Sequence, residues 1–178
     1  IIKIASCAAR DWPLIEKIAT KNLPVIVSTG GLDVDDVDNL VSFFNHRGVD
    51  FAIMHCRSIY PTPAEKCCLG RIKEFSERYP GVVIGWSTHE VPQDMDPVVA
   101  AYCLGARIFE RHIGVETDEI KLNAYSSPPH IIDRWLDAWQ KAKYLYGTED
   151  QTRDDDERAT LDRLKRGAYI KKDVEAGT

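Results

Sequence analysis

Short apolar runs rich in β-branched residues alternate with longer, more polar stretches along the chain. The runs cover residues 2–6, 24–28, 51–55, 82–87 and 106–112. Runs of this length and composition are typical of strands. The middle three are almost continuously apolar, as in strands that are buried on both faces. The pattern therefore predicts parallel strands in a covered sheet.

The stretches between these runs carry helix signals. Apolar residues recur there every three or four positions, behind a capping residue or a proline. Asp33 and Gly48 are suitable caps for one helix, and Pro63 begins another that carries Cys67 and Cys68. The predicted helices begin near residues 12, 34, 63, 97 and 128. This alternation of strands and helices predicts parallel βα units.

Polar residues stand at the carboxyl end of nearly every apolar run. The βα units alone fit either an open doubly wound sheet or most of a (β/α)8 barrel. In a barrel, the carboxyl ends of the strands meet at one face, where barrel enzymes carry their chemistry. The polar residues in question are Ser6, Ser28, Thr29, His55, Ser87, His89 and His112. We therefore predict an α/β fold of the (β/α)8 TIM-barrel class.

The predicted barrel is incomplete. Its units occupy residues 1–147, whereas a whole barrel needs eight strands and roughly 200 residues. Because the chain also begins within a strand, we expect a fragment of a longer protein. Residues 148–165 are strongly charged and are interpreted as a linker or helix edge, and residues 166–178 as the start of another module. A strand and a turn are expected over Tyr169–Thr178.

Composition and charge narrow the class of protein. With 178 residues, 44% of them apolar and 29% charged, the chain is typical of a folded globular protein. Its net charge of −5 argues against nucleic acid or an anionic membrane as a partner. The five cysteines include no CxxC pair, so no disulfide framework is expected. We expect reduced, packed thiols and a cytoplasmic location.

His89 and His112 are candidate metal ligands. They end successive predicted strands, and neighbouring strand ends in a barrel lie close together. Two imidazoles with open positions for water and substrate suit a Lewis-acid ion such as manganese, iron or zinc. The alternative for each residue is a hydrogen-bonded structural histidine. His55 could be a third ligand or a base, or a hydrogen-bonded histidine at the strand edge.

A ring of donors is expected around the same face. One ammonium group and several hydroxyls suit a phosphate or carboxylate, and Gly30-Gly31 would let backbone amides approach an anion. The alternative for each serine is a helix cap. The predicted donors are Lys3, Ser6, Ser28, Thr29, Ser58 and Ser87.

Several segments in order resemble motifs of the sialic acid synthase family. Lys3-Ile4-Ala5-Ser6 is similar to the KIxS strand of that family, and Val27-Ser28-Thr29-Gly30 to its STG turn. His55 to Pro63 resembles the HCTxxYPTP loop. Gly85 to His89 is similar to GxSDH, and Glu110-Arg111-His112 to the ERHF strand end. The resemblance implies condensation of phosphoenolpyruvate with an N-acylated amino sugar or a related aldose, giving a nonulosonic acid and phosphate.

The resemblance also implies an architecture. It places strands four to eight of a (β/α)8 barrel in residues 1–147 and the start of a C-terminal antifreeze-like domain in residues 166–178. In the family, that domain covers the active site of the partner subunit, so a homodimer is implied.

Site roles follow from the resemblance residue by residue. His89 and His112 would bind a divalent metal, with Mn²⁺ expected and Mg²⁺, Co²⁺ or Zn²⁺ as alternatives. Tyr60 would contact the sugar, and Lys3, Tyr60 and Asn123 would act in catalysis. The residues implied to bind phosphoenolpyruvate are Lys3, Ser6, Ser28, Ser58 and Ser87.

Three family carboxylates are replaced in this chain. Ala8 stands where the family has a glutamate two residues after the KIxS serine, Thr88 replaces the SDH aspartate, and Asn123 the GPD aspartate. Asn123 can orient a water or a sugar hydroxyl but cannot take a proton. Two alternatives therefore stay open: a homologue that binds sugar or phosphoenolpyruvate without turnover, and another metal-dependent barrel lyase acting on a ketoacid.

Overall fold

The computed structural model describes residues 1–147 and 154–177. The chain divides into two compact units, Ile1–Tyr146 and Gly147–Thr178. The first unit contains a five-stranded parallel sheet with the strand order β1-β2-β3-β4-β5. The strands are β1 (Ile2–Ile4), β2 (Val25–Ser28), β3 (Phe51–Cys56), β4 (Val83–Thr88) and β5 (Ile108–Arg111).

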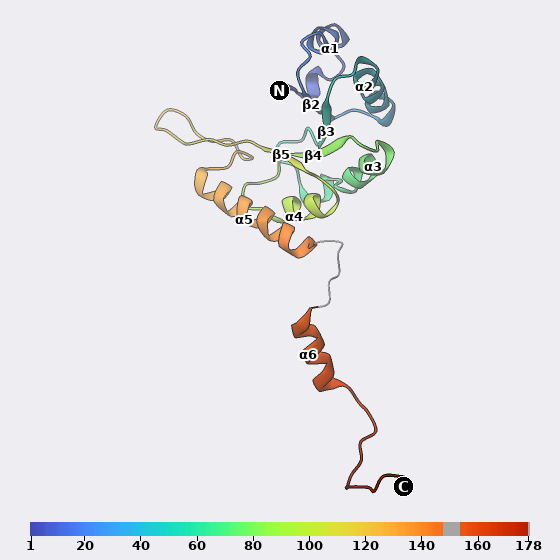
Figure 1. Ribbon diagram of the computed structural model, residues 1–178. Helices are drawn as coiled ribbons and strands as arrows, with labels where there is room; N and C mark the ends of the chain where they lie inside the picture. The colour runs from blue at the N-terminus through green and yellow to red at the C-terminus, as the bar shows by residue number, and fades with distance from the viewer. Residues whose placement is uncertain (148–153, 178) are drawn as a thin grey trace. The chain divides into compact units, whose positions relative to one another are not determined.

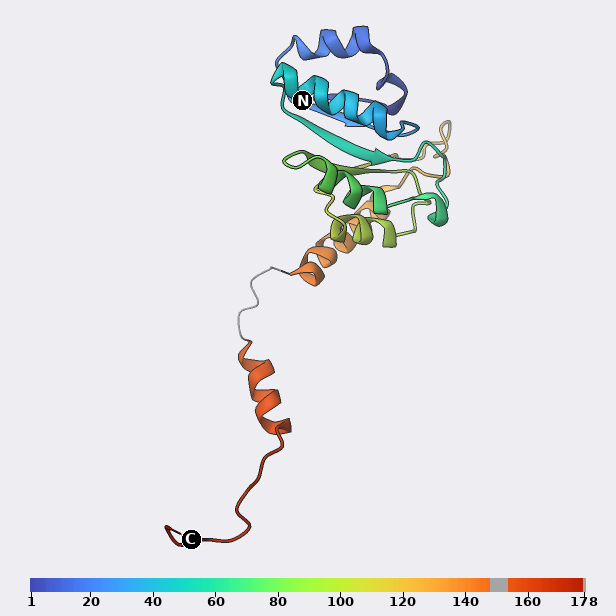
Figure 2. The same cartoon turned by 90° about the vertical axis from the view of Figure 1, so that its right-hand side faces the viewer.

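Helices follow the strands and cover one side of the curved sheet. Figures 1 and 2 show them in an arc around the strands, from α1 to α5. The predicted caps are confirmed: Asp33 forms a capping box at the start of α2, and Gly48 ends that helix with a φ of 63°. The α-helices of this unit are α1 (Trp12–Ala19), α2 (Val34–Arg47), α3 (Gly70–Arg78), α4 (Asp96–Cys103) and α5 (Pro129–Tyr146).

The two faces of the sheet have different chemistry. Successive side chains of a strand point to opposite faces, and residues paired across parallel strands share a face. Ile4, Val27 and Ile53 lie on the helix-covered face and belong to the buried core, with Phe44 and Phe75 from the helices. The opposite face carries polar side chains toward the carboxyl ends of its strands: Lys3, Ser28, Cys56, Ser87 and Glu110.

The helix predicted from Pro63 is wrong in its first part. A short 3₁₀ helix covers Ala64–Lys66, and α3 begins only at Gly70. Cys68, between them, has a φ of 50°, which no α-helix accommodates. Cys67 and Cys68 therefore do not lie on one helix. The expectation of packed thiols is also wrong in part, since Cys56 and Cys67 are buried but the thiols of Cys7, Cys68 and Cys103 belong to exposed residues.

The second unit contains α6 (Asp155–Leu164), whose N-cap is Asp154. No strand occurs over residues 169–177, so the strand expected there is wrong for the described part of that segment. Residues 148–153 of the predicted linker lie outside the described residues. In the two described ranges, no helix is both long and apolar enough to cross a bilayer. The confirmed fold class is α/β, with a curved parallel sheet that corresponds to part of a barrel.

Candidate active site

A cleft of about 400 Å³ opens at the carboxyl ends of the strands, on the face that the helices leave uncovered. It brings together most of the side chains predicted to meet there. Its lining consists of Lys3, Ala5, Ser6, Cys7, Ser28, Gly30, Cys56, Ser58, Tyr60, Ser87, His89, Glu110 and His112.

Lys3 is the cationic centre of this cleft. Its Nζ donates hydrogen bonds to the Ser28 hydroxyl at 2.8 Å and to the Ile4 carbonyl at 3.1 Å. The same atom lies 3.3 Å from a carboxylate oxygen of Glu110. Glu110 is the only carboxylate among the described lining residues and is not among the predicted site residues. Its alternation with Phe109 on β5 is the signal that could have identified it, because Glu110 shares a face with Ser87.

Ser6 and Ser58 meet over Gly30. The Gly30 amide donates to the Ser6 hydroxyl at 2.9 Å, so this amide is already engaged within the chain. A Cβ atom at position 30 would lie 2.4 Å from Ser58 Oγ and 2.8 Å from Ser6 Oγ. Glycine therefore lets both hydroxyls approach the turn after β2.

His89 and His112 lie side by side at the ends of β4 and β5, with ring centroids 5.2 Å apart. The Nδ1 atom of His89 is 3.0 Å from the Arg57 carbonyl, which can only accept, so Nδ1 carries the proton and Nε2 keeps its lone pair. Burial lowers the pKa of His89, which favours this neutral ring. Within residues 1–147 and 154–177, there is no group of three or more His, Cys, Asp or Glu side chains that could hold a metal ion. The two imidazoles can therefore supply two ligands.

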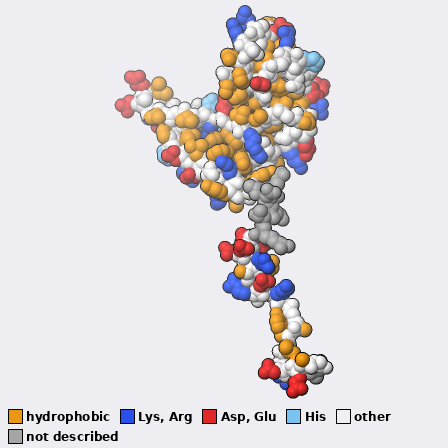
Figure 3. Space-filling model, in the orientation of Figure 1, with side chains coloured by type: hydrophobic (Ala, Val, Ile, Leu, Met, Phe, Trp, Pro, Cys, Tyr) orange, Lys and Arg blue, Asp and Glu red, His pale blue; other side chains and the backbone are white. Residues whose placement is uncertain are grey.

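Two tyrosines pack against these imidazoles. The Tyr60 ring lies 4.5 Å from the His89 ring, and the Tyr125 ring 5.0 Å from the His112 ring, measured between centroids. Tyr60 and Tyr125 also contact each other at 5.1 Å. Tyr125 was not predicted. It belongs to the long loop between β5 and α5, which extends away from the sheet and carries acidic side chains at its tip (Figure 3).

A buried ion pair lies on the opposite face of the same strand ends. Arg111 donates to Glu90 at 2.9 Å, with side chains only 2% and 1% exposed. Arg111 also donates to the Ser127 hydroxyl at 2.7 Å. Because Glu90 follows His89 and Arg111 precedes His112, the pair ties the two histidine-bearing segments together. Burial raises the pKa of Glu90, and the charge of Arg111 opposes that rise.

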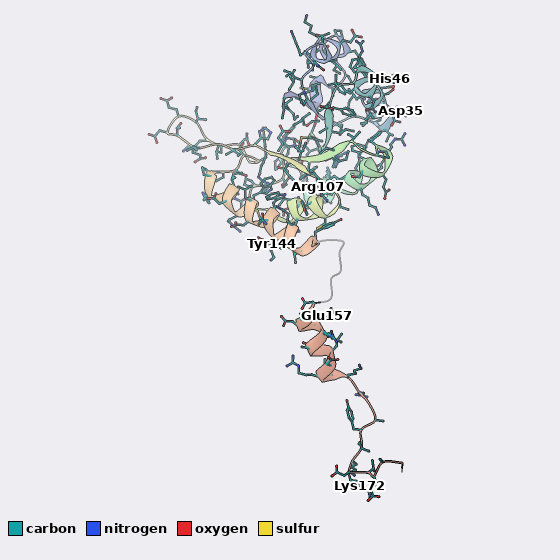
Figure 4. The ribbon with its side chains drawn as sticks, viewed as in Figure 1. Asp35, His46, Arg107, Tyr144, Glu157 and Lys172 are labelled. Carbon is teal, nitrogen blue, oxygen red and sulfur yellow. The ribbon has the colours of Figure 1, made fainter. Side chains whose placement is uncertain are left out.

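Several predicted residues lie outside the cleft. Asn123 lines a separate depression near the start of α5, and its side-chain oxygen accepts from the Tyr125 amide at 3.2 Å. The Thr29 hydroxyl donates to the Met54 carbonyl at 3.1 Å. His55 is buried on the helix-covered face, where Nε2 contacts the Cys67 carbonyl at 2.8 Å, so it is a hydrogen-bonded core residue. His46, which is not a predicted site residue, lies on the outer surface of α2, as Figure 4 shows.

Comparisons with known proteins agree on one family. A model of the NeuB family matches residues 1–150. The chain is 40% identical over 119 residues to N-acetylneuraminate-9-phosphate synthase of Drosophila melanogaster, across 66% of this chain and 32% of that protein. It is 31% identical to pseudaminic acid synthase of Campylobacter jejuni, across 98% of this chain and 50% of that protein. The chain thus spans about a third to a half of these curated relatives.

Solved structures give the same result. A structure from Chromobacterium violaceum, described as a candidate spore coat polysaccharide biosynthesis protein E, is similar with a TM-score of 0.89 and 47% identity. That similarity covers 93% of this chain and 50% of the other. N-acetylneuraminic acid synthetase from Leptospira borgpetersenii, in complex with citrate, is similar with a TM-score of 0.80 and 25% identity. It covers 90% of this chain and 56% of the other.

Proposed function

Because this chain belongs to the NeuB family, we propose that it provides active-site residues of a nonulosonic acid synthase. The reaction condenses phosphoenolpyruvate with an N-acylated amino sugar, or a related aldose, and releases phosphate. The observation that carries this proposal is the convergence of Lys3, three or more hydroxyls and two imidazoles in one cleft. A cation with hydroxyl donors suits an anionic substrate, and adjacent imidazoles suit a metal.

The architecture proposed with this function is a (β/α)8 barrel of which residues 1–147 supply strands four to eight. Residues 148–165 form the linker, and residues 166–178 begin the C-terminal antifreeze-like domain through which two subunits pair. The relatives named above are about two to three times as long as the stretch they share with this chain, which leaves room for the remaining strands and for that domain. We propose a cytoplasmic enzyme whose ligands are small molecules.

Phosphoenolpyruvate would bind to Lys3 and to the hydroxyls of the cleft. Lys3 Nζ already orients the Ser28 hydroxyl, and Ser6, Ser58 and Ser87 line the same space. The Lys3 ammonium would attract the substrate anion, and the hydroxyls would fix its orientation toward the sugar aldehyde. Such positioning supplies a large part of the rate enhancement in bimolecular reactions.

A divalent metal fits the donor set of His89 and His112. The neutral ring of His89 keeps its Nε2 lone pair, and His112 lies beside it. We propose Mn²⁺, with Mg²⁺, Co²⁺ or Zn²⁺ as alternatives. Such an ion, when bound, polarises a carbonyl oxygen and stabilises the negative charge that develops there.

The chemistry places separate demands on the chain's own residues. C3 of the enolpyruvate bonds to the aldehyde carbon, water adds at C2, and phosphate leaves as the C2–O bond breaks. The aldehyde oxygen gains a proton and the attacking water loses one. Glu110 is placed to accept the proton that the attacking water loses, because its carboxylate lies in the cleft beside Lys3. Tyr60 would contact the sugar from its position over the His89 ring.

The three replaced carboxylates are weaker evidence against catalytic turnover than the sequence alone implies. Ala8, Thr88 and Asn123 are not among the cleft's lining residues, whereas Glu110 is. Thr88 is buried on the helix-covered face, as its pairing with Arg111 in the sheet requires. This arrangement favours an active synthase over a binding homologue without turnover, and over another ketoacid lyase.

The test is phosphate release by the full-length protein with phosphoenolpyruvate, Mn²⁺ and a panel of N-acyl hexosamines. We expect release that depends on one of these sugars, and a nonulosonic acid in the product by mass spectrometry. His89→Ala and His112→Ala should lose Mn²⁺ binding in elemental analysis. His46→Ala, on the outer surface of α2, is the matched control. A folded protein that turns over no sugar would contradict the proposal.

A further inference from the structure

A second cavity, of about 350 Å³, lies beyond the cleft wall, between the segments that follow β2 and β3. It shares only Cys56 with the lining of the cleft described above. Its other walls come from the start of α2, the end of β3 and the first turn of α3. The lining consists of Thr29, Gly31, Leu32, Asp33, His55, Cys56, Arg57 and Arg71.

Both arginines of this cavity have buried donors without partners. Arg57 Nε and Arg71 Nη2 make no hydrogen bond in the described part of the chain, although each atom is inaccessible to water. The described residues also offer neither guanidinium an ion pair within 4.0 Å, whereas Arg10, Arg78 and Arg111 each have one. A buried cationic donor without a partner is costly, and it usually indicates a ligand, an ion or a water.

The remaining polar groups of the cavity are already engaged. The Thr29 hydroxyl donates to the Met54 carbonyl, and the Asp33 carboxylate accepts from the Asp36 amide in the α2 capping box. His55 contacts the Cys67 carbonyl through Nε2. Two arginine side chains therefore line this cavity against one carboxylate, and neither arginine has an ion-pair partner within the described residues.

The electrostatics of His55 agree with this arrangement. Burial is the main cause that lowers its pKa to about 4, and the charges of Arg71 and Arg57 lower it further. Both guanidinium groups thus act on the same imidazole in the cavity wall. An imidazole held neutral adds no positive charge of its own.

We infer that Arg57 and Arg71 form an anion site, separate from the cleft, for a phosphate-class oxyanion. Guanidinium groups present planar pairs of donors that match tetrahedral oxyanions. Either an inorganic phosphate ion or the phosphate group of a phosphorylated sugar would satisfy this chemistry. The backbone carbonyl of Arg57 also accepts the hydrogen bond from His89 Nδ1. An anion at this site would therefore contact the residue that orients the His89 ring in the cleft.

The experiment is isothermal titration calorimetry of the full-length protein with inorganic phosphate in chloride buffer at constant ionic strength. We expect binding that Arg57→Gln and Arg71→Gln each weaken at least about tenfold, since each removes a charged donor. Arg57→Lys, which keeps the charge but loses the planar fork, should fall between wild type and Arg57→Gln. Arg47→Gln, exposed at the end of α2, is the matched control and should bind like wild type.

Thermal unfolding separates this role from a structural one. Without phosphate, Arg57→Gln should be at least as stable as wild type, because it removes an unpartnered buried donor. Added phosphate should raise the midpoint of wild type more than that of Arg57→Gln or Arg71→Gln. No phosphate binding by wild type would overturn the inference, and so would glutamine variants that bind phosphate as tightly as wild type.

The same titration identifies the source of the phosphate. If an N-acyl hexosamine 6-phosphate binds at least about tenfold more tightly than inorganic phosphate, and Arg57→Gln removes that preference, the group belongs to a sugar. Equal affinities that Arg57→Gln lowers alike identify a free phosphate ion. Lys3→Gln should remove phosphate binding in the cleft, where Lys3 lies, and leave the binding that depends on Arg57 and Arg71. These measurements need no turnover, so they stand whether or not the proposed synthase activity is found.

Discussion

The imidazole of His55 lies in the core as a neutral group. Its ring is 5.1 Å from that of Trp86 and 6.4 Å from that of Phe75, between centroids. His55 is only 1% exposed. The side chain thus packs like an aromatic core residue while Nε2 satisfies the Cys67 carbonyl. At the scale of single residues, such burial turns a titratable group into a contribution to pH-dependent stability.

We expect His55 to make the folded state lose stability in acid. Its folded-state pKa of about 4 lies below the ordinary value of 6.5, so between these values the unfolded chain binds a proton that the folded chain does not. The free energy of unfolding should therefore fall by about 3 kcal/mol as the pH drops through this window. Urea unfolding of wild type and His55→Gln from pH 7.5 to pH 4.5 measures this. Parallel pH profiles for the two proteins would contradict the assignment.

The Glu90–Arg111 pair predicts a different pattern of stability. Glu90→Gln leaves the Arg111 charge buried without a counterion, which should destabilise the fold by about 3 kcal/mol. The double variant Glu90→Gln/Arg111→Met removes both charges and should recover most of that loss, since well-packed neutral groups often replace a buried pair at little cost. Denaturant unfolding checks both. A double variant as unstable as Glu90→Gln would refute the ion-pair explanation.

Single residues of the site were predictable where a motif or a strand end marked them. Lys3, Ser28, Ser87, His89 and His112 stand at such positions, and the structure brings them together. Glu110 was missed because its alternation with Phe109 indicates the cleft face only once the register with Ser87 on β4 is known. Tyr125 was missed because its contact with His112 depends on the path of a long loop, which no local pattern determines.

At the scale of elements, the strands were predictable because buried parallel strands leave continuous apolar runs. The helix after Pro63 was not, because only a 3₁₀ turn follows this proline, and no side chain caps it. Cys68 then adopts a left-handed conformation, although cysteine has no particular preference for it. Cys67, next to this break, is buried in the core.

The turn after β2 provides a test at the same scale. Gly30→Ala places a Cβ atom within 2.4 Å of Ser58 Oγ and 2.8 Å of Ser6 Oγ. The hydroxyls can rotate away, so the fold should survive, but they should leave their positions in the cleft. We expect the affinity for phosphoenolpyruvate to fall by about tenfold, measured by calorimetry.

Gly70→Ala is the control for this substitution. It adds the same methyl group at the start of α3, where nothing lies within 4 Å and φ is not positive. We expect unchanged affinity and no loss of stability, because alanine favours a helix over glycine. Equal affinity in both alanine variants would show that the hydroxyls over Gly30 do not bind the substrate.

At the scale of the whole molecule, the sheet has two unpaired edges in the described residues. β1 pairs only with β2, and β5 only with β4. Apolar residues next to these edges are also exposed: Ile1 at 81%, and Ile113 at 61% although its backbone bridges to Ser127. Open edges with apolar neighbours favour pairing between chains. The outer strands β1 and β5 are therefore places where a further strand can pair.

We therefore expect the 178-residue chain to self-associate. Light scattering coupled to size-exclusion chromatography should give a molar mass above 20.1 kDa that rises with protein concentration. Ile1→Lys/Ile113→Lys should lower that mass, because charged residues beside an edge strand oppose pairing. Leu161→Lys, an exposed residue of α6 in the second unit, is the control and should leave edge-driven association unchanged. A monomer of constant mass at all concentrations would mean that the edges are protected, and a reduction only in Leu161→Lys would assign the contact to the second unit.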